Sequence, residues 1–210
     1  MKDQSFIREL KAYQKRIIDW MAFKETKQGT QFNKEQNTVI KFVVPLLEIL
    51  GWECSAHNVE FEYFVPKKGR ADIALYINDP EVPKILVEVK PIQDSIKNAA
   101  TQMFSKYLVN SKVNFGITTN GRLLMLFDKF RVNRQYQHAR LLLTLKSEDL
   151  VKYEDVLSVF SRNKVKNGIL DKLVNAYHKK EYWEWRKFQK KEYDEYQLPL
   201  IYARRFLKRN

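Results

Sequence analysis

The chain has 210 residues, a formal net charge of +13 and one cysteine. Hydrophobic residues make up 44% and charged residues 30% of it, which indicates a globular protein with one sizeable core rather than a disordered chain. The single cysteine excludes an intrachain disulfide and a Cys-rich zinc site, so we expect a reducing, cytoplasmic setting.

The positive charge favours polyanionic partners, with DNA or RNA ahead of an anionic membrane surface. Basic proteins that bind no nucleic acid carry similar charge, so the charge ranks partners without choosing one. The N-terminal stretch MKDQSFIRELKAYQKRIIDW is interrupted by charge every few residues. It therefore lacks the apolar core of a signal peptide or a membrane-spanning helix, and we expect neither export nor a membrane span.

Two helices are expected at the start of the chain. Apolar residues recur at spacings of three and four in residues 3–24, which predicts an amphipathic helix that packs on the core. A second helix is expected to begin at Asn33, where Asn33 and Gln36 resemble a capping box, and to end at Gly51. Pro45 is expected to bend this second helix.

Short runs of β-branched and aromatic residues, separated by turn residues, predict strands in the middle of the chain. The runs are NVEFEYFV, ADIALYI, KILVEVK, KVNFGITT and RLLMLFD. Asn120 and Gly121, between the last two, predict a hairpin turn. The stretch DSIKNAATQMFSKYLVN predicts a helix that crosses between strands, with Ser95 as its cap.

After about residue 145 the pattern is helical again. The expected fold is an α/β fold, with a central mixed β-sheet that has helices on both sides. We expect an N-terminal helix in residues 1–30, the core in 31–145 and a helical C-terminal extension, packed on that core, in 146–210.

Three ionisable residues, Asp72, Glu88 and Lys90, lie inside the apolar strand runs. Glu88 and Lys90 are two apart and share a face of their strand. An antiparallel hairpin across NDPEVP has an available register, not fixed by the sequence, that puts Asp72 on that face. Two facing carboxylates repel unless a cation lies between them. Mg²⁺ held by such a pair beside a lysine suits phosphodiester hydrolysis, whereas the alternative is an ordinary ion pair at a strand end.

These residues resemble the PD-(D/E)xK nuclease motif. The wider context is similar to the N-terminal endonuclease domain of type I restriction enzyme motor subunits, over roughly residues 33 to 130. The supporting stretches are KEQNTVIKFVVPLLEILGWE, GRADIALYI, PKILVEVKPI, QMFSKYLV and FGITTNGRLLMLFD, in the order of that family. The resemblance implies a restriction-endonuclease-like core.

By position, the resemblance implies that Asp72 and Glu88 are metal ligands, that Val89 offers a backbone carbonyl to the metal, and that Lys90 is the catalytic lysine. Glu35 matches an acidic residue on the first core helix of the family, which often completes the metal site. Equally, an acid in the first turn of a helix is favoured by the helix dipole. The implied cofactor is Mg²⁺ or Mn²⁺.

The sequence departs from the family pattern at two places. Ala71 replaces the proline of the motif name. The family has Gln and Tyr four apart, whereas Gln102 and Tyr107 are five apart. Five residues correspond to about 140° around a regular α-helix, so the two side chains share a face only if the helix has a local bulge. We expect Gln102 to be a site or DNA contact and Tyr107 to be a core residue.

Basic residues precede the acidic pair. Lys67, Lys68 and Arg70 lie in the turn before the first acidic residue and are well placed to contact a phosphate backbone. The aromatic and basic stretch HKKEYWEWRKFQKKEYDEY, near the C-terminus, could stack bases and neutralise phosphates. We favour a packing helix there.

The remaining reactive residue types are assigned structural or surface roles. His57, His138 and His178 have no ligand spacing, and Cys54 has no activating context. No GxxxxGK[ST] stretch is present, so this chain carries no motor of the type I enzymes.

The sequence thus predicts a metal-dependent nuclease acting on DNA. Two alternatives stay open: a nucleic-acid-binding module with the same fold that does not cut, and a nuclease directed at RNA. A homodimer or partner subunits are plausible, because a small nuclease with no recognisable specificity domain needs its target chosen for it.

Overall fold

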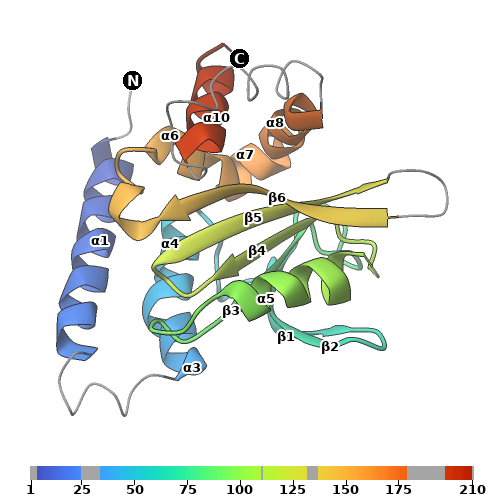
Figure 1. The fold of residues 1–210 in the computed structure, drawn as a ribbon, viewed down its shortest axis with the longest axis horizontal. Helices are drawn as coiled ribbons and strands as arrows, with labels where there is room; N and C mark the ends of the chain where they lie inside the picture. The colour runs from blue at the N-terminus through green and yellow to red at the C-terminus, as the bar shows by residue number, and fades with distance from the viewer. Residues whose placement is uncertain (1–3, 25–33, 110, 132–136, 179–196, 210) are drawn as a thin grey trace.

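A single six-stranded mixed sheet forms the centre of the computed structural model, with helices on both of its faces (Figure 1). The structure describes residues 4–24, 34–109, 111–131, 137–178 and 197–209. The strands lie in the sheet in chain order, β1 to β6. All neighbours are antiparallel except β3 and β4, which are parallel. The expected α/β fold is confirmed.

The strands are β1 (Val59–Val65), β2 (Gly69–Leu75), β3 (Ile85–Val89), β4 (Phe115–Thr119), β5 (Leu123–Arg131) and β6 (Gln137–Lys146). The helices before and within the sheet are α1 (Gln4–Lys24), α3 (Glu35–Thr38), η1 (Val39–Val43), α4 (Val44–Ile49), α5 (Lys97–Gln102) and η2 (Met103–Leu108). Those after it are η3 (Ser147–Asp149), α6 (Glu154–Leu157), η4 (Ser158–Phe160), α7 (Arg162–Lys166), α8 (Ile169–His178) and α10 (Gln197–Arg209).

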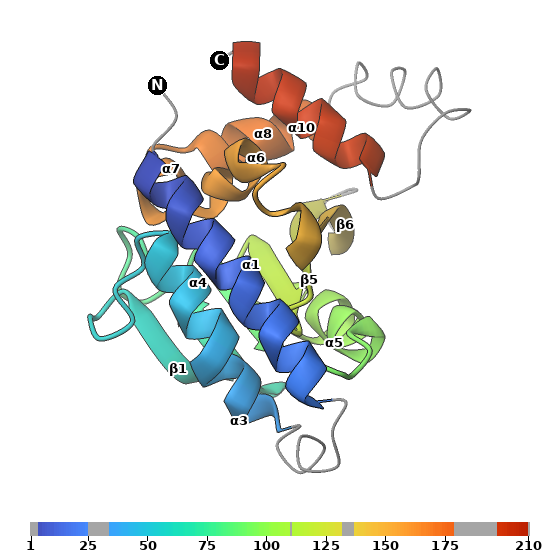
Figure 2. The ribbon, with the colours of Figure 1, turned by 90° about the vertical axis from the view of Figure 1, so that its left-hand side faces the viewer.

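The two faces of the sheet bury different side chains because successive residues of a strand point to opposite sides. Ile73 and Val87 join a large core that includes α1, α4 and the C-terminal helices. Ala74 and Leu86 join a smaller core that η2 covers. Figure 2 shows α1 and α4 side by side, with α5 on the far side of the sheet. The division into residues 1–30, 31–145 and 146–210 stays a prediction.

The helix before the sheet is not a regular α-helix. It begins at Glu35, after Lys34, and it passes through the π-helical turn η1 before α4. Pro45 lies in the first turn of α4, and its ring and missing N–H prevent a regular α-helical turn before it. A widened turn precedes Pro45, and the bend expected there stays a prediction. Asn33, half of the expected capping box, lies outside the described residues.

The crossover between β3 and β4 is also irregular. It starts as α5 and widens into the π-helix η2. The N-cap position of α5 is Ile96 and not the expected Ser95, although the Ser95 hydroxyl accepts a hydrogen bond from the Lys97 backbone N–H at 3.3 Å. The Ser105 hydroxyl donates to the Thr101 carbonyl oxygen at 2.8 Å. The same kind of bond, from the Thr101 hydroxyl to the Lys97 carbonyl oxygen at 3.1 Å, occurs one turn earlier in α5.

The sheet has one strand more than the sequence analysis identified. β6 pairs antiparallel with β5 along nearly its whole length. Its run Leu141, Leu142, Leu143 has no alternation that separates strand from helix, so periodicity gave no signal there. The expected hairpin between β4 and β5 is confirmed, and the Asn120 side-chain oxygen accepts hydrogen bonds from the Arg122 and Leu123 backbone N–H groups at 3.0 Å each.

The described residues after η3 form helices α6, η4, α7, α8 and α10, and these helices contribute side chains to the large core. The basic and aromatic stretch lies mostly in residues 179–196, outside the described part of the chain. Among the helices that the structure describes, none combines the length and the apolar character needed to cross a membrane.

Gly116 on β4 offers a test of how tightly η2 packs on the sheet. A Cβ atom at this position would overlap the Met103 sulfur and would lie 3.2 Å from Leu108 Cδ1. We expect Gly116→Ala to destabilise the protein by about 1–3 kcal/mol through overpacking. Urea denaturation measures this loss. The double variant with Met103→Ala should lose less than the sum of the two single changes, and strict additivity would contradict the contact.

Candidate active site

The antiparallel pairing of β2 with β3 brings the two acidic residues together. Ile73 pairs with Val87, and continuing this register by one residue puts Asp72 opposite Glu88, on the same face of the sheet. The Asp72 Oδ2 atom accepts a hydrogen bond from the Val89 backbone N–H at 2.5 Å. The structure thus adopts the register that the sequence left available.

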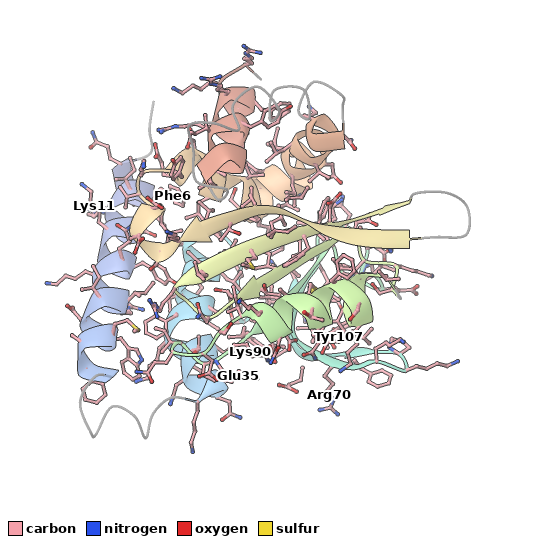
Figure 3. All side chains as sticks on the ribbon, viewed as in Figure 1. Phe6, Lys11, Glu35, Arg70, Lys90 and Tyr107 are labelled. Carbon is pink, nitrogen blue, oxygen red and sulfur yellow. The ribbon has the colours of Figure 1, made fainter. Side chains whose placement is uncertain are left out.

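Lys90 follows β3 directly and points to the same face. Its Nζ atom donates to Glu88 Oε1 at 3.0 Å and to Glu35 Oε2 at 2.9 Å. Its backbone N–H donates to the Thr119 carbonyl oxygen at 2.9 Å, so the residue is held to the sheet although it lies past the strand. Figure 3 shows Glu35 and Lys90 next to each other at one edge of the molecule, with Arg70 and Tyr107 nearby.

Burial disfavours the ionised forms of the two carboxyls at this site, and a further cation would offset this effect. Burial, and then the charge of Glu88, raise the pKa of Asp72 to about 7. Burial also raises the pKa of Glu88, although the hydrogen bond and charge of Lys90 oppose it. Burial lowers the pKa of Lys90, but its hydrogen bonds to Glu35 and Glu88 outweigh this, so the net pKa is raised and the ammonium form is stabilised.

The geometry of the acidic pair suits a divalent cation. Glu88 is only 3% exposed, and its buried Oε2 atom has no hydrogen-bond partner in the part of the chain that the structure describes. Such an orphan acceptor is costly unless a ligand satisfies it. Within the described residues, no three His, Cys, Asp or Glu side chains are gathered so as to hold a metal alone. Mg²⁺ takes one or two carboxylates and completes its shell with water and phosphate oxygens, so the chemistry of the two carboxyls at this site fits such an ion.

The widened turn of η2 solves the spacing problem between Gln102 and Tyr107. The Gln102 side-chain Nε2 donates to the Tyr107 hydroxyl at 2.6 Å, so the two side chains do meet. The Tyr107 hydroxyl in turn donates to the Arg70 carbonyl oxygen, two residues before Asp72. Tyr107 is fully buried in the core under η2, as expected. It therefore ties the crossover to the strand that carries the first acidic residue.

Basic side chains lie along the approach to the acidic pair. Lys67 and Arg70 are exposed and Lys68 is half-buried. Arg70 makes a loose ion pair with Glu62, with 3.9 Å between Nη1 and Oε2. A pair this exposed contributes little to stability, so the guanidinium can exchange this partner for another anion.

One cation near the site was missed by the sequence analysis. The Lys106 Nζ atom lies 3.5 Å from the position that a Cβ atom would take at Gly69, which starts β2. The positive charge of Lys106 acts to lower the pKa of Glu88. Its spacing of four residues from Gln102 was the available signal, because residues four apart lie on one side of a helix.

Of the other reactive residues singled out in the sequence, the structure describes the side chains of His57 and Cys54. His57 is exposed in the loop before β1. The side chains of His138 and His178 are outside the described residues. Burial, and then the charge of Glu48, raise the pKa of the Cys54 thiol to about 11, so this thiol stays protonated and unreactive at neutral pH.

The mixed sheet flanked by helices, with this cluster at the end of β3, defines a restriction-endonuclease-like α/β fold. Residues 34–142 match the family described as "Type I restriction enzyme R protein N terminus (HSDR_N)". The match spans just over half of the chain, and the chain belongs to this family. The resemblance seen in the sequence is thereby confirmed.

One solved structure is similar to the chain, the one described as "cryoEM structure DrdV-DNA complex". The TM-score is 0.44 and the sequence identity 16%, and the similarity covers 73% of this chain but 14% of that one. The chain thus spans about a seventh of the length of that protein, and so distant a likeness has no bearing on function. No curated protein matches the sequence.

The raised pKa of Asp72 predicts how the stability of the metal-free protein depends on pH. The folded state binds the Asp72 proton more tightly than the unfolded state, in which the pKa is close to 3.8. Stability should therefore fall as the pH rises from about 4 to about 7, and Asp72→Asn should remove this loss. Since one pKa unit is worth about 1.4 kcal/mol, we expect the variant to exceed the parent by at least about 1 kcal/mol at pH 8.

Denaturant midpoints measured in EDTA across this pH range check the prediction. Glu53→Gln, an exposed acid outside the site, serves as the matched control and should leave the pH profile unchanged. An Asp72→Asn profile parallel to that of the parent would show that the carboxyl is not strained.

A double-mutant cycle tests the contact across η2. Tyr107→Phe removes the hydroxyl that accepts from Gln102 and donates to the Arg70 carbonyl. We expect it to cost about 1–2 kcal/mol in unfolding free energy. Combining it with Gln102→Ala should reveal a coupling of about 0.5 kcal/mol or more. A coupling near zero would mean that the two residues do not interact in solution.

Proposed function

We propose that this protein is a metal-dependent nuclease that hydrolyses phosphodiester bonds of DNA. One observation carries the proposal: Asp72, Glu88 and Lys90 meet on one face of the sheet, and the Glu88 Oε2 atom is buried there with no partner among the described residues. An isolated strand-end ion pair, the simpler reading, does not account for a second buried carboxyl beside the first. Membership of the restriction enzyme family supports the same function.

Asp72 and Glu88 would hold Mg²⁺ or Mn²⁺, with the Val89 carbonyl as a further ligand. When bound there, such an ion polarises the scissile phosphate and lowers the pKa of a bound water. Its charge also favours the ionised form of both carboxyls, which burial disfavours. The acidic pair thus gains stability from the same ion that the chemistry needs.

Lys90 would act as a charged hydrogen-bond donor. Its raised pKa keeps the side chain an ammonium at neutral pH, so it is suited to orienting the attacking water and to stabilising charge on the phosphate in the transition state. Glu35 shares this ammonium with Glu88, and it would hold Lys90 in place. Gln102, anchored through Tyr107, would contact the site or the DNA.

The basic residues would bind the backbone of the substrate. Lys67, Lys68 and Arg70 lie in the turn and strand that lead to Asp72, and Lys106 lies across from them on η2. Each phosphate contact made by a lysine or arginine releases counterions, so binding should weaken steeply as salt increases. These contacts carry no sequence information, so target choice would come from a partner subunit or a second copy.

Removal of the ammonium from the site should abolish cleavage. We expect Lys90→Ala to reduce nicking of supercoiled plasmid in Mg²⁺ or Mn²⁺ by at least about hundredfold, because an electrostatic stabiliser of the transition state is lost. Lys84→Ala is the matched control: Lys84 is also a partly buried lysine paired with an acid, Asp171, at 2.7 Å. It should cut like the parent.

Circular dichroism verifies that both lysine variants are folded. Cleavage that persists in rigorously purified Glu88→Ala protein would overturn the assignment. A gel shift in EDTA separates the alternatives: salt-sensitive binding of DNA with no cutting under any divalent ion would favour a non-catalytic binding module. Cleavage of RNA but not of DNA would redirect the proposal to an RNA substrate.

A further inference from the structure

Thr118 is buried beside the acidic pair and has no evident task in the fold. It lies on β4 directly across from Glu88, in the parallel register that joins β3 to β4. Its side chain is 0% exposed, and its Oγ1 atom has no hydrogen-bond partner among the described residues. A buried hydroxyl without a partner costs free energy, so its position relative to Glu88 decides whether it has a role.

The neighbouring threonine shows what a structural hydroxyl does in this strand. The Thr119 Oγ1 atom donates to the Leu123 carbonyl oxygen at 2.7 Å and accepts from the Gly121 backbone N–H at 3.0 Å. Its side chain points to the opposite face and holds the hairpin turn. The turn is thus complete without Thr118.

Two orphan atoms of complementary chemistry occupy facing positions on β3 and β4. The Glu88 Oε2 atom is an acceptor without a donor, and the Thr118 Oγ1 atom carries a proton without an acceptor. Neighbouring strands lie about 4.8 Å apart, so the two side chains are within reach of each other through a rotamer change. The other Glu88 oxygen already accepts from Lys90.

We infer that Thr118 is a positioning residue for Glu88. After a rotamer change that turns it toward Glu88, its hydroxyl would donate to the Glu88 Oε2 atom and hold the carboxylate in one orientation for a divalent ion. Partners of this kind raise metal affinity because they hold the ligand in its binding orientation and support its charge. The inference rests on the proposed metal site, and it concerns a residue that does not touch the metal or the substrate.

Thr144 provides a matched control within the same sheet. It is buried, its Oγ1 atom is likewise unpartnered in the described structure, and it lies on the same face, because Thr118 pairs with Met125 and Met125 pairs with Thr144. Three strand spacings, about 14 Å, separate it from Glu88. Removing its hydroxyl changes the same chemistry outside the site.

The test is Mn²⁺ binding to the full chain, followed by the EPR signal of the free ion, together with denaturation in EDTA. Thr118→Val should weaken Mn²⁺ binding about tenfold or more and leave the denaturation midpoint of the metal-free protein unchanged or higher. Thr118→Ser should keep the affinity of the parent, because the hydroxyl remains. Thr144→Val should match the parent in Mn²⁺ affinity.

The outcomes separate this inference from the function on which it rests. Parent protein that binds Mn²⁺ no better than Glu88→Gln would overturn the metal site and the Thr118 role together. Mn²⁺ binding that is lost in Glu88→Gln but unchanged in Thr118→Val would overturn the Thr118 role alone. An equal loss of affinity in Thr118→Val and Thr144→Val would also overturn it, because the effect would then not depend on proximity to Glu88.

Discussion

The pairing of β2 with β3 is the constraint on which the candidate site depends. In an antiparallel pair, a shift of one residue would move every side chain of a strand to the other face. The observed register puts Ile73 and Val87 in the large core and leaves Asp72 opposite Glu88 on the other face. The apolar residues that hold the hairpin in register therefore also hold the two carboxyls together, at the cost of burying like charges.

Lys90 makes this arrangement tolerable in the metal-free protein. Its ammonium bonds both Glu88 on β3 and Glu35 on α3, so one cation, carried by the segment after β3, joins these two elements. Removing one partner from a buried charge cluster lowers the free energy of unfolding, because the remaining charges are left buried without a partner. A buried cluster of charges therefore adds little to the free energy of unfolding, but it is suited to binding a further cation.

Two π-helical turns, η1 and η2, lie next to the site. A local sequence signal accounts for the first of them but not for the second. The turn before α4 follows from Pro45, whose effect on a helix is local. The turn in η2 has no such residue. It coincides with contacts made outside the helix: Met103 packs against Gly116, and the Tyr107 hydroxyl bonds the Arg70 carbonyl. From the spacing alone, Gln102 and Tyr107 diverge around a regular helix, whereas the widened turn lets them meet.

The sequence by itself determined the strands β1 to β5 and the residue types of the candidate site. The β-branched runs, the Asn120 and Gly121 turn and the charges at Asp72, Glu88 and Lys90 are local signals. It left Glu35 open between a helix-dipole acid and a site residue, and only the fold put it on Lys90. It missed β6, Lys106 and Thr118. Strand pairing and packing between distant segments depend on the whole core. The identity of a residue in a strand does not reveal which residue of the neighbouring strand it faces. These features were therefore decided only in the tertiary structure.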